Sequence, residues 1–131
     1  MRFGRVALSA SLAVVLAANA ILNAGTDAQK AELLPGIAAG ETIAALAFTE
    51  PNGKWDESGI TMQATPAGDG WTLTGTKMYV IDGHTATLII VAARTDKGVS
   101  LFTVAGDASG LTRTALSTMD QTRKQARLEF D

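Results

Sequence analysis

The sequence GTKMYVIDG, residues 75–83, decides the fold of this chain, because it brings a long strand-like run to a turn. The run starts at Trp71 and closes on Asp82-Gly83, a dipeptide suited to positive φ. An earlier stretch, ALAFTEP at residues 45–51, also leads an apolar run into polar and turn residues. Each stretch places a hydroxyl or a backbone group at the end of an apolar strand. A planar, hydrogen-bonding ring could lie against the sheet there.

Short β-rich runs separated by turn residues surround these two stretches. They occupy residues 42–48, 59–65, 71–81, 87–93, 99–104, 111–116 and 124–130. The run at 87–93 is apolar without alternation, as expected of a strand covered on both faces. Asp96-Lys97-Gly98 links it tightly to 99–104 as a hairpin. About seven strands at this spacing indicate a sandwich or a barrel.

Composition describes one globular domain and narrows its function. Of the 131 residues, 47% are hydrophobic and 18% charged, which is far from the composition of disorder. The chain carries a net charge of −2 and should repel phosphate backbones, so no nucleic-acid partner is expected. With no cysteine and one histidine, His84, it cannot build a disulfide or a Cys/His metal site. His84 has no evident catalytic partners, and no metal ligand is assigned.

The amino end, residues 1–24, allows two interpretations. Arg2 and Arg5, the apolar run 6–18 and the small residues 18–20 resemble a signal peptide cleaved near residue 20, which would make the chain a secreted β-rich binding module. The longer run 6–22 is interrupted by Ser9, Ser11 and Asn19, so no membrane span is expected.

The other interpretation is an alanine-rich core helix, because its leucines recur at spacings near three and four. Gly25 would end this helix, and Thr26 would cap a second, amphipathic helix at 27–34 that Pro35-Gly36 stop. This continuity favours a helical hairpin before the strands.

With these elements in place, the chain resembles the acyl-CoA dehydrogenase family. Residues 69–77, DGWTLTGTK, are similar to the family's D-G-W/Y-x-L-x-G-x-K, and 79–83 stand where the family has W-I-T/S-N-G. Thr49-Glu50-Pro51 and the segments 29–41 and 118–130 also fit, so the resemblance covers residues 17–131. It overlaps the possible signal peptide and favours the core helix.

The resemblance implies an α+β fold, in which a helical hairpin precedes an antiparallel flattened β-barrel or sandwich. Residues 1–40 would be the C-terminal part of the family's N-terminal helical domain, and 41–131 most of its middle β-domain. It further implies bound FAD, with Phe48, Thr49, Tyr79 and Ile81 as cofactor-binding residues and an acyl-CoA thioester on the far side of the flavin ring. In the family a carboxylate removes the α-proton while the β-hydrogen leaves as hydride to the flavin.

Three positions depart from the family pattern. Ile81 stands where a threonine or serine is usual near the flavin, so only its backbone N–H could donate there. Tyr79 replaces the common tryptophan, and Trp55 replaces a serine expected to touch substrate.

The family's general base lies in a C-terminal helical bundle, so no catalytic residue is assigned in this sequence. We expect a fragment in the cytoplasm that is inactive without that helical domain or a partner subunit. Near the end, Arg113, Arg123, Lys124 and Arg127 form a modest concentration of basic side chains, either a solvated face or a phosphate contact.

Overall fold

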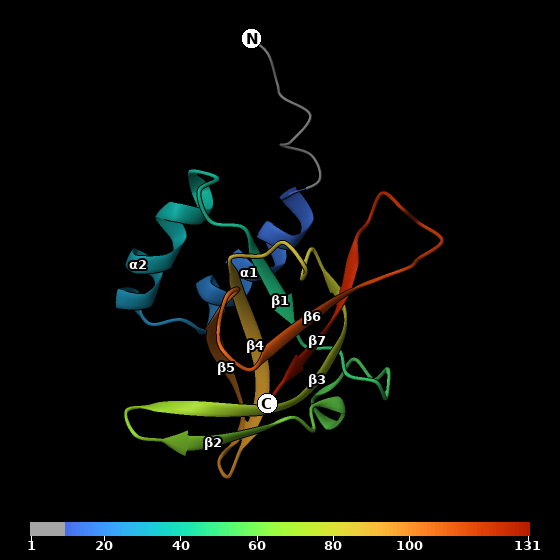
Figure 1. The fold of residues 1–131 in the computed structure, drawn as a ribbon. Coiled ribbons are helices and arrows are strands. Elements are labelled where there is room, and N and C mark those ends of the chain that lie inside the picture. The colour runs from blue at the N-terminus through green and yellow to red at the C-terminus, as the bar shows by residue number, and fades with distance from the viewer. Residues whose placement is uncertain (1–9) are drawn as a thin grey trace.

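The computed structural model describes residues 10–131 as two helices followed by a curled, mixed sheet of seven strands (Figure 1). The elements are α1 (Ala10–Ala24), α2 (Asp27–Ala38), β1 (Ala44–Ala47), a 3-10 turn (Glu57–Gly59), β2 (Gln63–Ala67), β3 (Gly70–Ile81), β4 (Leu88–Thr95), β5 (Gly98–Ala105), β6 (Leu111–Leu116) and β7 (Gln125–Phe130). The predicted α+β class, helical hairpin and seven strands are confirmed. The basic start of the possible signal peptide, Arg2 and Arg5, lies outside the described residues.

The two helices are separated as the sequence predicts, but the second is longer. The Thr26 hydroxyl accepts a bond from the Gln29 amide at 3.3 Å, and the Gln29 side chain accepts from the Thr26 amide at 2.9 Å, which is a capping box. Helix α2 continues through Pro35 to Ala38, so the prediction that Pro35-Gly36 stop it was wrong. Ile37, in the extra turn, is buried against the sheet, and this packing outweighs the hydrogen bond that proline removes.

The sheet order is β1-β4-β2-β3-β7-β6, and β5 lies off this path, paired with β4. The β2–β3, β3–β7, β4–β5 and β6–β7 pairs are antiparallel, as expected. The β1–β4 pair is parallel, as is the single β2–β4 contact, so the expectation of a wholly antiparallel sheet was wrong there. The chain runs through β2 and β3 before β4 returns beside β1, and such a long crossover permits parallel pairing.

Strand β2 also starts later than predicted. Residues 57–59 form the 3-10 turn, and pairing of β2 with β3 extends to Pro66 and Ala67, which were expected in a loop. Ile60 and Met62 are nevertheless buried, at 6% and 3% exposure, as their alternation with Ala64 predicts.

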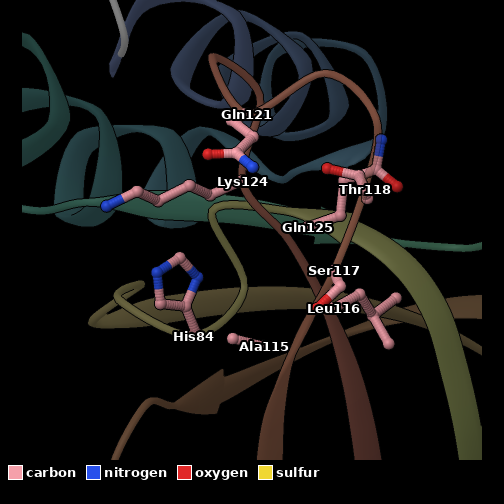
Figure 2. Close-up of a pocket in the computed structure, with 8 residues that line it drawn as sticks. All are labelled: His84, Ala115, Leu116, Ser117, Thr118, Gln121, Lys124 and Gln125. Carbon is pink, nitrogen blue, oxygen red and sulfur yellow. The ribbon is translucent and has the colours of Figure 1, made fainter.

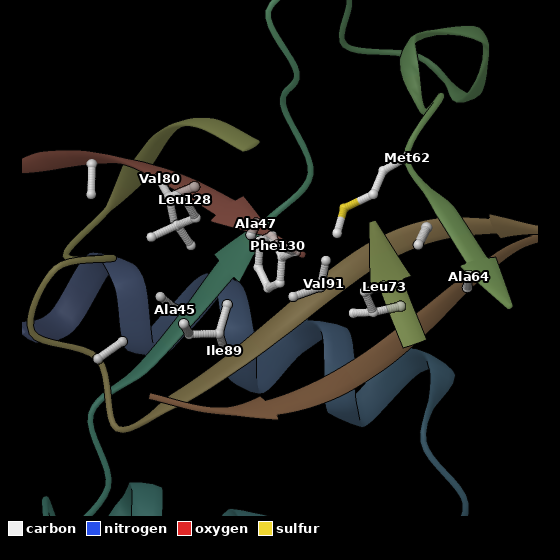
Figure 3. Close-up of a cluster of buried hydrophobic side chains, with 13 residues drawn as sticks. Ala45, Ala47, Met62, Ala64, Leu73, Val80, Ile89, Val91, Leu128 and Phe130 are labelled. Atoms are coloured by element: carbon white, nitrogen blue, oxygen red, sulfur yellow. The ribbon is translucent and has the colours of Figure 1, made fainter. Parts of the chain in front are cut away.

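Strands β1 and β4 are covered on both faces. Ala45 and Ala47 point with Ile89 and Val91 into the main core inside the curl of the sheet (Figure 3). The alternate residues of the two strands face the other way, where Ala44 and Ile90 pack with α1 and α2. This confirms the prediction made from the unbroken apolar run at 87–93.

Strand β3 contains the irregularity that shapes the site. Its register against β7 shifts between Lys77 and Val80, which marks a β-bulge. Within the bulge, Tyr79 takes a φ of 58°, and Asp82 at the following turn takes 54°. Non-glycine residues rarely adopt positive φ, and such strain clusters at functional sites.

Candidate functional site

A hollow of about 480 Å³ lies where β1 and β3 end, and all four cofactor-binding residues predicted from sequence line it. Phe48 and Thr49 follow β1, while Tyr79 and Ile81 end β3. Six further residues complete the wall: Leu16, Leu46, Trp55, Met78, Val80 and Gln125. The structure thus brings together two sequence motifs about thirty residues apart in a cavity whose size is typical of ligand sites.

The bulge in β3 fixes how the two motifs meet. The Met78 amide donates a hydrogen bond of 2.8 Å to the Thr49 carbonyl, so the bulged segment pairs with the residue that follows the end of β1. Tyr79, next in the chain, is 53% exposed and faces the hollow instead of the core. Bulges often re-aim a side chain in this way beside active sites.

A buried ion pair joins the same two segments. Lys77 and Glu50 are 0% and 2% exposed, and the Lys77 Nζ lies 2.8 Å from the Glu50 Oε1. The ammonium also donates to the Phe48 carbonyl at 3.4 Å. The Glu50 carboxylate accepts further bonds from the Met62 and Thr61 amides, each at 2.9 Å, and from the Thr61 hydroxyl. Both charges are therefore paired and hydrogen-bonded, as burial requires.

The surroundings of this ion pair lower the pKa of both Glu50 and Lys77. Burial alone would raise the pKa of Glu50, but the hydrogen bonds from Lys77, Thr61 and Met62 outweigh it and hold that pKa below its ordinary value. Burial lowers the pKa of Lys77, and the attraction of Glu50 offsets part of that effect. Neither residue lines the hollow, so the pair supports the site from beneath.

The hollow offers hydrogen-bonding groups at two places. The Thr49 side chain forms no hydrogen bond with another described residue, and Thr49 is 7% exposed at the wall of the hollow. The Asp82 amide donates to the Lys124 carbonyl on the β7 side at 2.9 Å. Because amides alternate direction along an antiparallel strand, the Ile81 N–H points away from β7. Both groups remain available to a ligand.

Aromatic side chains border the hollow. Phe48 and Trp55 meet edge to face, with ring centroids 6.0 Å apart and planes at 85°. Trp55 is 80% exposed, so its ring stands at the mouth of the hollow. Two polar donors within mostly apolar and aromatic walls suit a flat heteroaromatic ligand.

Sequence reasoning missed part of this wall. Leu16 comes from the amino-terminal segment whose interpretation was open, and Gln125 begins a strand considered only for its apolar pattern. Nothing in the sequence around Leu46 and Met78 distinguishes a ligand-contacting side chain from one packed in the core. Among the lining residues there is no carboxylate and no histidine.

Residues 10–131 contain no group of three or more acidic, histidine or cysteine side chains that could hold a metal ion. No helix in that range is long and apolar enough to cross a membrane.

Comparisons with known proteins agree with the geometry. The family model "Acyl-CoA dehydrogenase, middle domain" matches residues 45–131, and "Acyl-CoA dehydrogenase, N-terminal domain" matches residues 2–41. The chain is 36% identical over 112 residues to the mitochondrial isovaleryl-CoA dehydrogenase of Arabidopsis thaliana, covering 82% of this chain and 27% of that protein. It is 38% identical over 113 residues to the short-chain acyl-CoA dehydrogenase of Megasphaera elsdenii, covering 82% and 30%.

Solved structures give the same result. The butyryl-CoA dehydrogenase of Megasphaera elsdenii superposes with a TM-score of 0.82 and 35% identity, over 96% of this chain and 34% of that one. A glutaryl-CoA dehydrogenase from Mycobacterium smegmatis, in complex with FADH2, gives a TM-score of 0.79 and 32% identity, over 87% and 30%. The chain therefore spans about a third or less of the length of these relatives.

Proposed function

Because the chain belongs to the acyl-CoA dehydrogenase family, we propose that residues 41–131 form the flavin platform of an FAD-dependent acyl-CoA dehydrogenase. Residues 1–40 would then be the last part of its N-terminal helical domain. The substrate class is a fatty acyl-CoA thioester, and the cytoplasm is the compartment we propose, since α1 packs as a core helix on β1 and β4.

One observation carries this proposal. Phe48 and Thr49 from one motif, and Tyr79 and Ile81 from another, line a single hollow. They belong to elements held in register by the Lys77–Glu50 pair and by the bond from the Met78 amide to the Thr49 carbonyl. Residues scattered over unrelated faces could not hold one ligand, whereas these can.

The residues of the hollow fit the flavin ring by their chemistry. The Thr49 hydroxyl and the Ile81 N–H would donate to the polar edge of the ring, and such bonds strengthen as negative charge develops there in a dry site. The side chains of Phe48 and Tyr79 would contact the ring through their own aromatic surfaces. When bound, FAD supplies the two-electron acceptor for α,β-dehydrogenation.

Proton abstraction requires a group that this hollow does not supply. Dehydrogenation removes an α-proton, and a general base must stand within hydrogen-bond reach of it. Since no carboxylate lines the hollow among the described residues, we propose that the base comes from a helical domain or a partner subunit placed opposite the platform.

Reconstitution tests the proposal. The purified 131-residue chain is incubated with FAD, separated from free cofactor by gel filtration, and examined by visible absorbance and circular dichroism. We expect a folded chain that retains FAD in about equal molar amount. A chain with the circular dichroism of the folded state that emerges colourless at every FAD concentration contradicts autonomous cofactor binding.

A further inference from the structure

A second hollow, of about 360 Å³, lies between the turn after β3 and the loop that leads into β7 (Figure 2). Its polar wall is made by His84, Ser117, Thr118, Gln121, Lys124 and Gln125. Figure 2 shows the imidazole of His84 and the side chain of Lys124 projecting into the same space from opposite segments. None of the functions assigned above uses this hollow.

His84 contributes a buried nitrogen that lacks a partner. Among the described side chains, only its Nδ1 is fully enclosed without a hydrogen bond. Buried polar atoms are rarely left unpaired in folded proteins, and each exception needs an explanation such as a bound ion or ligand. His84 lines the hollow, and its imidazole forms no hydrogen bond with the other described residues, so the ring is free to bond a ligand that enters there.

The turn that carries His84 is held firmly by a basic side chain. The Arg113 guanidinium on β6 donates to the Ala86 carbonyl at 2.9 Å and lies 3.5 Å from the Gly83 carbonyl. It therefore contacts the backbone before and after His84. These contacts hold the turn that carries the His84 imidazole.

The charge balance of the wall favours an anion. Lys124 brings an ammonium, Gln121 and Thr118 bring amide and hydroxyl groups, and no carboxylate lines the hollow. The nearest acid of the loop, Asp120, turns back on its own chain, where it accepts a bond from the Thr122 amide at 2.9 Å. A lysine with neutral donors and no competing acid suits an oxyanion.

We propose that this hollow binds a phosphate group, with Lys124 as the charged contact and His84 as a hydrogen-bonding contact. The hollow adjoins the first one, since Gln125 lines both. A phosphate carried by a ligand in the first hollow and a free phosphate ester have the same chemistry here. The source therefore has to be separated by experiment.

Proton NMR of the 131-residue chain tests the site directly, because His84 is the only histidine and its ring resonances need no assignment. Inorganic phosphate should shift them saturably, while chloride at the same ionic strength should not. Lys124→Gln should weaken phosphate binding about tenfold, as loss of one charged hydrogen bond implies. Lys124 is exposed in a loop, so this variant should fold.

Lys97→Gln is the matched control, since Lys97 is an exposed lysine on the β4–β5 turn outside this hollow. It should leave phosphate affinity unchanged. The inference is overturned if the shifts do not saturate, if chloride reproduces them, or if the two lysine variants lose affinity equally, because each result means general charge screening.

Comparing the affinities of riboflavin and FMN shows whether the bound phosphate belongs to the ligand of the first hollow. This comparison rests on the proposed function. FMN binding more tightly than riboflavin, by a margin that Lys124→Gln removes, supports a phosphate carried by the ligand of the first hollow. Equal affinities beside a saturable phosphate titration support a free phosphate ester. If neither flavin binds while inorganic phosphate still does, the flavin proposal fails and the phosphate site stands.

Discussion

Lys77 and Glu50 meet beside the hollow at the ends of β1 and β3 with their charged atoms 2.8 Å apart, and both are almost completely enclosed. Glu50 directly follows Thr49, and Lys77 stands two residues before Tyr79. The ion pair therefore joins the two chain segments that supply the proposed flavin contacts. The shape of the site and the stability of the fold depend on the same interaction.

Replacing Lys77 by methionine should destabilise the chain by about 3–5 kcal/mol, because it leaves the buried Glu50 carboxylate without its counter-ion. Urea denaturation followed by circular dichroism measures this. Glu57→Gln is the control, since Glu57 forms only an exposed pair with Arg94 at 3.9 Å and its removal should cost about 0.5 kcal/mol or less. If both variants lose a similar free energy of unfolding, the buried pair stabilises the fold no more than the exposed pair does.

Stability should fall on acidification partly through Glu50. Its pKa is lower in the folded chain than the ordinary 4.5, so its stabilisation is complete above about pH 4.5 and is lost as the pH falls through the folded-state value. The free energy of unfolding measured from pH 7 to pH 3 should decline less steeply in Glu50→Gln. Identical slopes for the two proteins would contradict a lowered pKa.

Thr49→Val should weaken FAD binding about fivefold and leave stability within about 0.5 kcal/mol, because the side chain lines the hollow and forms no hydrogen bond with another described residue. Quenching of flavin fluorescence gives the affinity, and urea denaturation gives the stability. Thr114→Val, at an exposed position on β6, serves as the matched control and should change neither. If Thr49→Val binds FAD with unchanged affinity, the Thr49 hydroxyl does not bond the flavin.

Tyr79→Gly should have opposite effects on stability and binding. The φ of 58° strains a tyrosine by about 1–2 kcal/mol and costs glycine nothing, although glycine loses more entropy on folding. We expect stability to stay level or rise by up to about 1 kcal/mol, while FAD affinity falls with loss of the aromatic wall. A clear loss of stability would mean that the ring packs against the fold instead of serving the ligand.

Gly75→Ala should be more damaging than Gly98→Ala, although both glycines have positive φ, 146° and 122°. A Cβ at residue 75 would lie 2.9 Å from the Met62 Cγ, whereas a Cβ at residue 98 would meet nothing within 4 Å. Both variants bear the backbone strain, so the difference between their unfolding free energies isolates the close approach of β3 to Met62. If the two variants lose equal free energies of unfolding, backbone strain at positive φ accounts for the whole destabilisation.

Local patterns predicted most of the strands because each carried its own signal. The β4–β5 hairpin follows from Asp96-Lys97-Gly98, and Gly98 indeed adopts positive φ. The apolar run in β4 correctly indicated cover on both faces. Strand direction has no local signal, so the parallel pairing of β1 with β4 was not foreseen. Helix α2 passed Pro35 because Ile37 is buried by residues far away in sequence.

The site was only partly predictable, for a similar reason. Motif order singled out Phe48, Thr49, Tyr79 and Ile81, which line one hollow, while their flavin contact remains a prediction. The importance of Lys77 could have been suspected, since its alternation with Leu73 places it on the buried face of β3, where a lysine requires an acidic partner. Which acid it selects is decided by tertiary packing, and here that acid lies 27 residues earlier.

The crossover from β1 to β4 also has a kinetic consequence. Ile43 and Thr87, 44 residues apart, are hydrogen-bonded just before the paired residues of β1 and β4, and contacts between such distant residues slow folding. The ends of β1 and β3 acquire their final positions only once this long connection has closed. A flavin should then recognise the finished chain and slow its unfolding, while the refolding rate remains that of the bare polypeptide.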